Sequence, residues 1–194
     1  SVPVYFGELE VETIGRTNDD GANLYAVRVR DPRESARKDF SNLEAFDYDT
    51  AWRVPASFRP TDRREIETVT VETGVREMTA RIGVLTVELG GTSYAREGIG
   101  KDSAAGIVPV VHVRDATSGD LTYGAGRVLE LTFADEAGTQ IDFADFNYLV
   151  PLPCAFTNFV TCPIPPQENH LRLAVTAGEK RPTVTLERVL TYAQ

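Results

Sequence analysis

Short segments of alternating apolar and polar residues, separated by Gly, Pro, Asn and Asp, recur along almost the whole chain. A period of two is typical of a strand with one buried face, and the separating residues favour turns. A chain with this pattern is expected to fold mainly as a sheet. The predicted strands and hairpins lie at 2–14, 22–30, 53–58, 66–72, 76–82, 83–97, 107–113, 127–133, 139–146, 171–176 and 184–191.

The turns between these segments predict which strands pair. A Thr-Asn-Asp-Asp-Gly turn at 17–21 joins the first two segments, so residues 1–29 form a hairpin. Within 83–97, Gly90 and Gly91 supply the positive φ angles of a tight hairpin turn. We expect the strand at 127–133 to pair with the strand at 139–146.

One helix is predicted near the N-terminus. Asp31 suits a capping position, Pro32 the first helical position, and Glu34 completes a pattern like a capping box. The helix should cover 32–43 and pack on the sheet through its apolar face. The fold class is therefore all-β, mainly antiparallel, and either barrel-like or a sandwich, with one packed N-terminal helix.

Length and charge limit the classes of partner. The 194 residues fit a single domain, 1–194. The formal charge of −9 argues against nucleic acid and anionic membranes. No apolar run reaches the ~20 residues of a membrane span. No basic and apolar leader precedes Ser1, which favours a cytoplasmic protein; a secreted protein whose leader was removed is the alternative.

The stretch DFNYLVPLPCAFTNFVTCPIPPQENHL, residues 145–171, holds five prolines and both cysteines but has no regular period. Prolines restrict the unfolded chain, so a long irregular loop can keep one shape. We expect Phe156 and Phe159 to anchor this loop by burial. The loop is then a rigid lid across one end of the sheet, and rigid lids often border ligand pockets.

The two cysteines of this loop, Cys154 and Cys162, leave three alternatives open. They can form a disulfide, remain reduced, or ligate a metal together with Glu168 and His170. The spacing lacks the C-x-x-C pattern of common metal sites, so no metal is predicted. The chain also lacks a P-loop and a dinucleotide fingerprint, and no cofactor is predicted.

A second unusual stretch, RDATSGDLTYGAGR at 114–127, ends in Arg127. Its first half has the composition of a turn held by Asx and Ser/Thr hydrogen bonds. Arg127 has two interpretations. It can hold a carboxylate or another anionic group of a ligand with parallel hydrogen bonds. Alternatively it pairs with Asp142 or Asp145 and fixes the sheet to the long loop.

These blocks resemble a known family. RDATSGDLTYGAGR, then DFN before CAFTNFVTCPIPPQEN, then AGEK, together with FDYD at 46–49, are similar to the DUF1684 family, a bacterial and archaeal family of unknown function. The resemblance covers about 30–181, with 1–29 and 182–194 as additions. It departs at 148–151, Tyr-Leu-Val-Pro, where the family usually carries a more polar run.

The resemblance implies a shared constellation of residues but no activity. Its members are Asp115, Ser118, Tyr123, Gly124, Arg127, Asp145, Asn147, Cys154, Cys162, Pro163, Glu168, Asn169 and Glu179. Whether these residues form a ligand site or a packing motif stays open at this point.

Three functions are compatible with these features. The leading hypothesis is a module that binds a small polar or anionic molecule near Arg127, under the loop at 147–169. Its predicted ligand-binding residues are Asp115, Ser118, Tyr123, Arg127, Asp145, Asn147, Glu168 and Asn169. The alternatives are a structural or interaction protein whose signature residues only hold the loop, and a hydrolase that uses Asp145, Glu168 or His170. The sequence does not indicate an oligomeric state.

Overall fold

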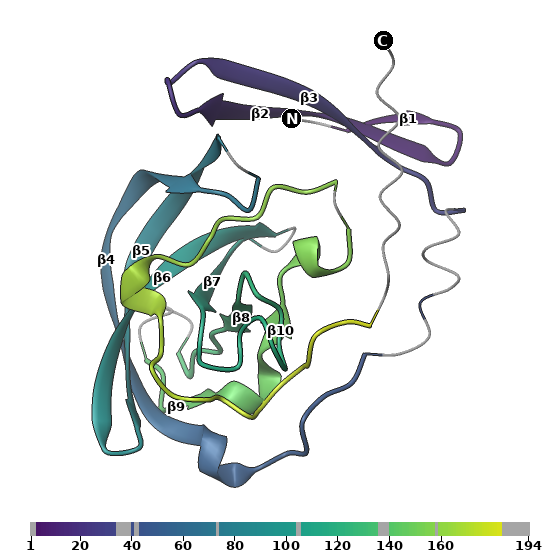
Figure 1. Cartoon of the computed structure of the whole chain (residues 1–194). Helices are drawn as coiled ribbons and strands as arrows, with labels where there is room; N and C mark the ends of the chain where they lie inside the picture. The colour runs from purple at the N-terminus through teal and green to yellow at the C-terminus, as the bar shows by residue number, and fades with distance from the viewer. Residues whose placement is uncertain are drawn as a thin grey trace.

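The fold is a single curved sheet that bends around an apolar core (Figure 1). The computed structural model describes residues 3–33, 40, 43–72, 74–103, 106–135, 140–157 and 159–183. The strands are β1 (Val4–Phe6), β2 (Leu9–Asn18), β3 (Asn23–Arg30), β4 (Arg53–Val69), β5 (Val75–Leu89), β6 (Thr92–Ser103), β7 (Gly106–Val113), β8 (Arg127–Glu130), β9 (Phe143–Asp145) and β10 (Val150–Pro151). The short 3-10 turns are η1 (Thr50–Trp52), η2 (Phe146–Tyr148), η3 (Pro153–Ala155) and η4 (Gln167–Asn169).

The strand order is β1-β2-β5-β6-β7-β8-β10, with β3 on β2 and with β4 on both β5 and β9. The named strand pairs are antiparallel, which confirms the predicted class. Within the described residues, no ladder joins β8 to β9, so the sheet stays open and a closed barrel is not formed. The predicted pairing of 127–133 with 139–146 is wrong, because β9 pairs with the start of β4.

The longest strands run through points where the sequence pattern indicated breaks. The segments predicted at 53–58 and 66–72 are joined in β4, whose register against β5 shifts between Pro60 and Arg64. The segment predicted at 76–82 is continuous with the hairpin that follows. Its turn is confirmed, because Gly90 and Gly91 have φ angles of 56° and 77°.

The N-terminal strands form a three-stranded meander, β1-β2-β3, which lies at the top of Figure 1. The predicted hairpin at 1–29 is confirmed for β2 and β3. The first predicted strand breaks at Gly7, whose φ of 62° allows an additional turn. The ladder between the meander and the rest of the sheet consists of Thr17 with Arg76 and Asn18 with Val75.

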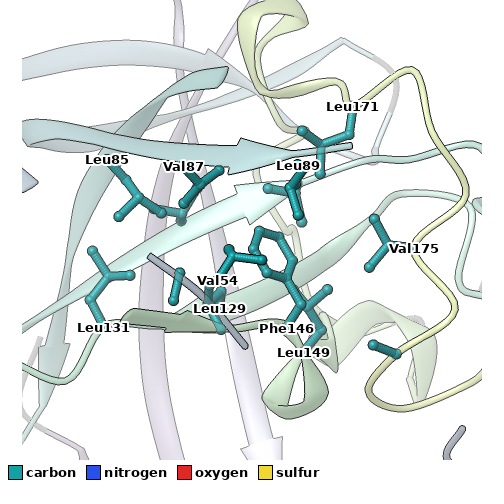
Figure 2. Close-up of a cluster of buried hydrophobic side chains, with 14 of the residues drawn as sticks. Val54, Leu85, Val87, Leu89, Leu129, Leu131, Phe146, Leu149, Leu171 and Val175 are labelled. Carbon is teal, nitrogen blue, oxygen red and sulfur yellow. The ribbon is translucent and has the colours of Figure 1, made fainter. Parts of the chain in front are cut away.

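The core lies inside the curve of the sheet (Figure 2). Leu85 and Val87 of β5 and Leu129 of β8 contribute apolar side chains from the sheet. Phe146 and Leu149 close the core from the segment at η2. Residues 171–181, which we call the C-terminal strap, cross the open side and bury Val175 against the same core.

The C-terminal strap is not the strand predicted at 171–176. Its backbone bonds to loops, with Ala116 N–H donating to the carbonyl of Leu173 at 3.0 Å and Glu179 N–H donating to that of Leu149 at 2.8 Å. Over residues 171–173 the strap pairs with the segment 114–116, because Leu171 N–H also donates to the carbonyl of Arg114 at 2.7 Å. The N–H of Val175 donates instead to the carboxylate of Asp115 at 3.3 Å, so the backbone pairing ends before a regular strand forms. The strand predicted at 184–191 lies outside the described residues.

The predicted helix at 32–43 is not seen. Pro32 and Arg33 form a turn in which the carboxylate of Asp31 accepts a hydrogen bond from the N–H of Arg33 at 2.9 Å. Phe40 and Leu43 are not helical, and residues 34–39 and 41–42 lie outside the described part. In the described part of the chain, no helix is long and apolar enough to cross a membrane.

Candidate functional site

Arg127 lies at the start of β8 and is completely buried. Its Nη2 donates to Asp115 Oδ2 at 3.0 Å and to the carbonyl of Val175 at 2.9 Å. Its Nη1 donates to the carbonyls of Ala177 and Glu179. Arg127 therefore fastens the C-terminal strap to the sheet through main-chain carbonyls.

The carboxylate of Asp115 completes this buried network. Its Oδ1 accepts hydrogen bonds from the N–H and the hydroxyl of Thr117, at 2.8 and 2.5 Å. The Thr117 hydroxyl also bonds that of Thr122 at 2.9 Å, and Ser118 Oγ accepts from the N–H of Asp115 at 3.1 Å. This confirms the predicted turn with Asx and Ser/Thr bonds. We call Asp115, Thr117, Thr122 and Arg127 the polar knot.

The polar knot corrects the expected ion pair of Arg127 and shows where its other donors point. Its acidic partner is Asp115, not Asp142 or Asp145. Its Nη1 and Nη2 donors are directed at protein groups, and the buried Nε has no hydrogen-bond partner. Burial lowers the pKa of Arg127, and the charge of Asp115 opposes this effect. Arg127 has no exposed surface, and its Nη1 and Nη2 hydrogen bonds go to Asp115 and to the C-terminal strap.

The proline-rich loop does pack beside Arg127, as predicted. Pro151 of β10 pairs with Arg127 of β8. Leu152, Cys154 and Cys162 form a small buried cluster of their own. The predicted anchoring by Phe159 is wrong, because 77% of this residue is exposed. Phe156 packs edge-on against Phe40, with 5.9 Å between the two ring centres.

Cys154 and Cys162 are buried free thiols rather than a disulfide. The N–H of Cys154 donates to Cys162 Sγ at 3.3 Å, and Tyr123 donates its hydroxyl to the carbonyl of Cys154 at 3.0 Å. The hydrogen bond from Cys162 lowers the pKa of Cys154 to about 7. Within the described residues, no group of three or more His, Cys, Asp and Glu could hold a metal ion.

Asn169 is buried where β6 and β7 separate. Its Oδ1 accepts from the N–H of Glu97 at 2.8 Å, and its Nδ2 donates to the carbonyls of Glu97 and His112 at 3.0 and 2.9 Å. The Asn169 side chain therefore bridges the backbones of β6 and β7 at a point where the two strands do not bond each other directly. Glu168 is exposed on η4, and His170 bonds the carbonyl of Pro165 through Nε2 at 3.3 Å.

A different set of polar groups surrounds Asp145. Its Oδ1 accepts from the N–H and Nδ2 of Asn147, at 3.1 and 2.8 Å. Its Oδ2 accepts from the hydroxyl of Tyr48 at 3.1 Å, and this bond raises the pKa of Tyr48. Asn147 in turn holds the backbone of Asp49, accepting at 3.1 Å and donating at 2.9 Å. The segments FDYD and DFN therefore meet at one surface.

A cleft of about 560 Å³ opens beside this surface, along the side of the sheet where β8 and β9 are not paired. We call it the seam cleft. Its walls are Tyr48, Arg53, Leu129, Glu130, Leu131, Thr132, Phe133, Ala134, Ile141, Asp142, Phe143, Ala144, Asp145 and Tyr148. The guanidinium of Arg53 lies 4.0 Å from the centre of the Phe143 ring. Tyr48 and Tyr148 expose 58% and 69% of their surfaces.

The match to a family model decides the membership. The model described as "Protein of unknown function (DUF1684)" matches residues 38–180. The chain belongs to the DUF1684 family. This DUF1684 protein is also similar to an uncharacterized protein from gene locus rrnAC0354 of Haloarcula marismortui, solved by solution NMR. The two are 29% identical with a TM-score of 0.59, over 81% of this chain and 83% of the other. No curated protein matches.

The structure divides the family's signature residues among separate places. Asp115, Ser118 and Arg127 lie in or beside the polar knot, and Glu179 offers it a carbonyl. Tyr123 joins the two cysteines. The seam cleft contains Asp145, which bonds Asn147. The β1-β2-β3 meander of this DUF1684 protein lies outside the residues that the family model matches.

Sequence reasoning missed four cleft residues: Tyr48, Arg53, Phe143 and Tyr148. The FDYD and DFNY segments carried a signal, because each places an aromatic residue beside a carboxylate. Only the fold shows that the two segments are adjacent.

Proposed function

We propose that this DUF1684 protein binds a small molecule in the seam cleft, and that the ligand is neutral or cationic with a flat apolar face. The observation that carries the proposal is the set of exposed aromatic rings beside carboxylates in one cleft. Aromatic side chains with a polar partner at one edge are typical of binding sites that hold a ligand's body and orient its polar group.

The rings supply the binding surface. Tyr48, Phe143 and Tyr148 are each more than two-fifths exposed, and all three line the cleft. Tyr48 is held in place by its hydrogen bond to Asp145, so one ring is fixed before a ligand arrives. Fixed rings lose little conformational freedom on binding, which favours affinity.

The charges of the cleft select the ligand. Among the described residues, its lining contains Glu130, Asp142 and Asp145 but a single cationic side chain, Arg53, which already stacks on Phe143. An anionic ligand would meet a negative surface here. A cationic group is attracted both by the carboxylates and by the ring faces. This replaces the polar or anionic ligand expected near Arg127.

The positions of the predicted acid and base favour binding over hydrolysis. Asp145 belongs to the seam cleft, whereas Glu168 and His170 lie at η4, and neither lines that cleft. A hydrolase needs its acid and base near one reacting atom. The polar knot has a structural role that is compatible with binding, because it fixes the scaffold around which the cleft forms.

A titration with two matched probes tests the proposal. Tyramine and 4-hydroxyphenylacetate share a phenol ring and differ in the charge of the attached group. Tyramine should shift the backbone amide resonances of residues 130–134 and 142–148, and 4-hydroxyphenylacetate should shift them far less. Equal responses, or tyramine shifts spread over other surfaces, would contradict the proposal.

A matched pair of variants locates the binding. Tyr148→Ala removes an exposed ring of the cleft and should weaken tyramine binding at least about five-fold, as expected for a central aromatic contact. Phe159→Ala removes a ring of similar exposure, 77% against 69% for Tyr148, outside the cleft and should leave the affinity unchanged. Equal losses in both variants would contradict the assignment.

A further inference from the structure

The register of the meander sorts its residues onto two faces. Residues directly opposite one another in a sheet share a face. Val4, Val11 and Val29 lie in one row across the three strands. Val27 opposite Thr13 and Tyr25 opposite Gly15 lie on the same face. Together with Phe6, these apolar residues form what we call the outer face: Val4, Phe6, Val11, Tyr25, Val27 and Val29.

The opposite face carries the charges and is directed at the rest of the protein. Arg16 Nε donates to Thr161 Oγ1 at 2.7 Å, and Arg16 pairs with Glu77 at 2.8 Å. Arg28 donates to the carbonyl of Phe159 at 3.3 Å and pairs with Glu12 at 2.7 Å. The rest of the sheet buries its apolar side on the core, whereas the meander reaches the rest of the protein through a face that mixes these charged residues with Ile14, Leu24 and Ala26.

The outer face is mainly apolar and exposed, and its β3 residues Tyr25, Val27 and Val29 also border a cleft of about 700 Å³ along the edge of the meander. Tyr25 is 81% exposed, Phe6 is 65% exposed and Val27 is 64% exposed. The rows on this face contain no charged side chain; their polar members are Thr13, Thr17 and Asn23. A contiguous exposed apolar patch of this kind marks an interaction surface.

We propose that the outer face is the contact of a symmetric homodimer, in which two meanders pack face to face. A two-fold axis places a surface against itself, and an uncharged apolar surface is compatible with its own copy. Each chain has a formal charge of −9, so two copies repel elsewhere and can meet best at a neutral patch. Two sheets packed in this way form a sandwich about 10 Å thick.

The area is sufficient for such a dimer. With aromatic side chains of about 150–250 Å² each and smaller valines, the exposed members of the outer face offer on the order of 500 Å². Two copies then bury roughly 1,000 Å², which is at the lower limit for a specific interface. The dimer should therefore dissociate on dilution through the micromolar range.

Sedimentation equilibrium over a range of protein concentrations tests the dimer. Val27→Glu places a carboxylate on each outer face, so the two charges oppose one another across the axis. Its dissociation constant should rise at least about ten-fold. Met78→Glu is the control, because Met78 is an exposed apolar residue of β5 outside the meander and should change the dissociation constant less than about two-fold. Amide spectra that retain the β2–β3 resonances exclude unfolding of the meander, and Tyr25→Ser provides a second, uncharged test.

Salt gives an independent readout. Screening the net charge should strengthen a dimer that forms through an uncharged face, whereas a dimer held by ion pairs should weaken. Three results overturn the proposal: a monomer at the highest concentration reached, a dimer unaffected by Val27→Glu and Tyr25→Ser, or a dimer that dissociates as salt is added.

Discussion

At the scale of single residues, Arg127 shows how one buried arginine can hold distant segments of a fold together. The guanidinium has no exposed surface and connects Asp115 to three carbonyls of the C-terminal strap. Burying a charge is unfavourable unless it is paired and hydrogen-bonded. The polar knot meets this condition, and it also holds together segments that are far apart in the sequence.

Arg127→Met should strongly destabilise the protein. It leaves the Asp115 carboxylate buried without its partner, which costs roughly 3–5 kcal/mol in the free energy of unfolding. Arg63→Met is the control, because Arg63 pairs with Glu65 on an exposed surface and should cost less than about 1 kcal/mol. Urea denaturation of both variants gives the comparison. Similar urea midpoints for the two variants would show that the polar knot contributes little to the stability of the fold.

Glu77 gives a prediction about pH. Burial raises its pKa from the ordinary value of 4.5, and this effect outweighs the attraction of Arg16 at 2.8 Å. Above pH 4.5 the folded state therefore keeps a proton that the unfolded state has lost, so this residue's contribution to stability falls as pH rises through that window. In Glu77→Gln this proton is absent. Denaturation at several pH values should show the wild type losing stability relative to the variant as pH rises. A constant or rising difference would mean that the ion pair dominates.

At the scale of elements, the packing of Phe58 explains two glycines in neighbouring strands. Gly83 of β5 and Gly98 of β6 pair with each other, and a Cβ on either would approach the Phe58 ring to 2.3 and 2.9 Å. The ring also contacts Phe133 edge-on at 5.3 Å. The two glycines therefore make room for one aromatic ring inside the curve of the sheet.

Gly83→Ala should lower the free energy of unfolding by roughly 1–3 kcal/mol, because the Phe58 ring and the backbone carbonyl of Arg59, 2.8 Å from the new Cβ, must both move. The same change in a Phe58→Leu background should cost less, since the smaller side chain leaves space. Gly15→Ala is the control: its new Cβ meets no atom within 4 Å, so an effect under about 0.5 kcal/mol is expected. If Gly83→Ala cost the same in both backgrounds, the Phe58 ring would not be the reason for the glycine.

Local patterns in the sequence were sufficient for some elements and not for others. The β2–β3 hairpin and the Gly90-Gly91 turn follow from alternation and turn residues, and β7 follows from a nearly continuous apolar run. The pairing of β9 with β4 does not, because strands about ninety residues apart are brought together by the core they share. Likewise one interpretation paired Arg127 with Asp142 or Asp145, which follow it in the sequence. Its partner Asp115 lies twelve residues before it, on a turn that is buried only in the folded protein.

At the scale of the whole molecule, the meander and the curved sheet differ in how they are held. The core cluster includes Leu85, Val87 and Leu89 of β5, whereas β3 is almost entirely exposed. A short ladder of two residue pairs joins β2 to β5. The meander should therefore open locally at a lower free energy than the curved sheet, because it has fewer buried contacts.

Hydrogen exchange on dilute protein should separate two tiers of protection. Amides of β3 that bond β2 should exchange on the order of 100-fold faster than amides of β5 that bond β6, because opening the meander exposes no core residue. Dilution keeps association from protecting the meander. Uniform protection across β3 and β5 would show that the meander opens only with the whole sheet.

The polar knot also constrains when this part of the chain can fold during its synthesis. The carbonyls that receive Arg127 come about fifty residues after it, near the end of the C-terminal strap. A ribosome that has released residue 127 has not yet made these acceptors. Until they emerge, burying the guanidinium would leave its charge without these acceptors, so this part of the core can close only after residues 175–179 have been translated.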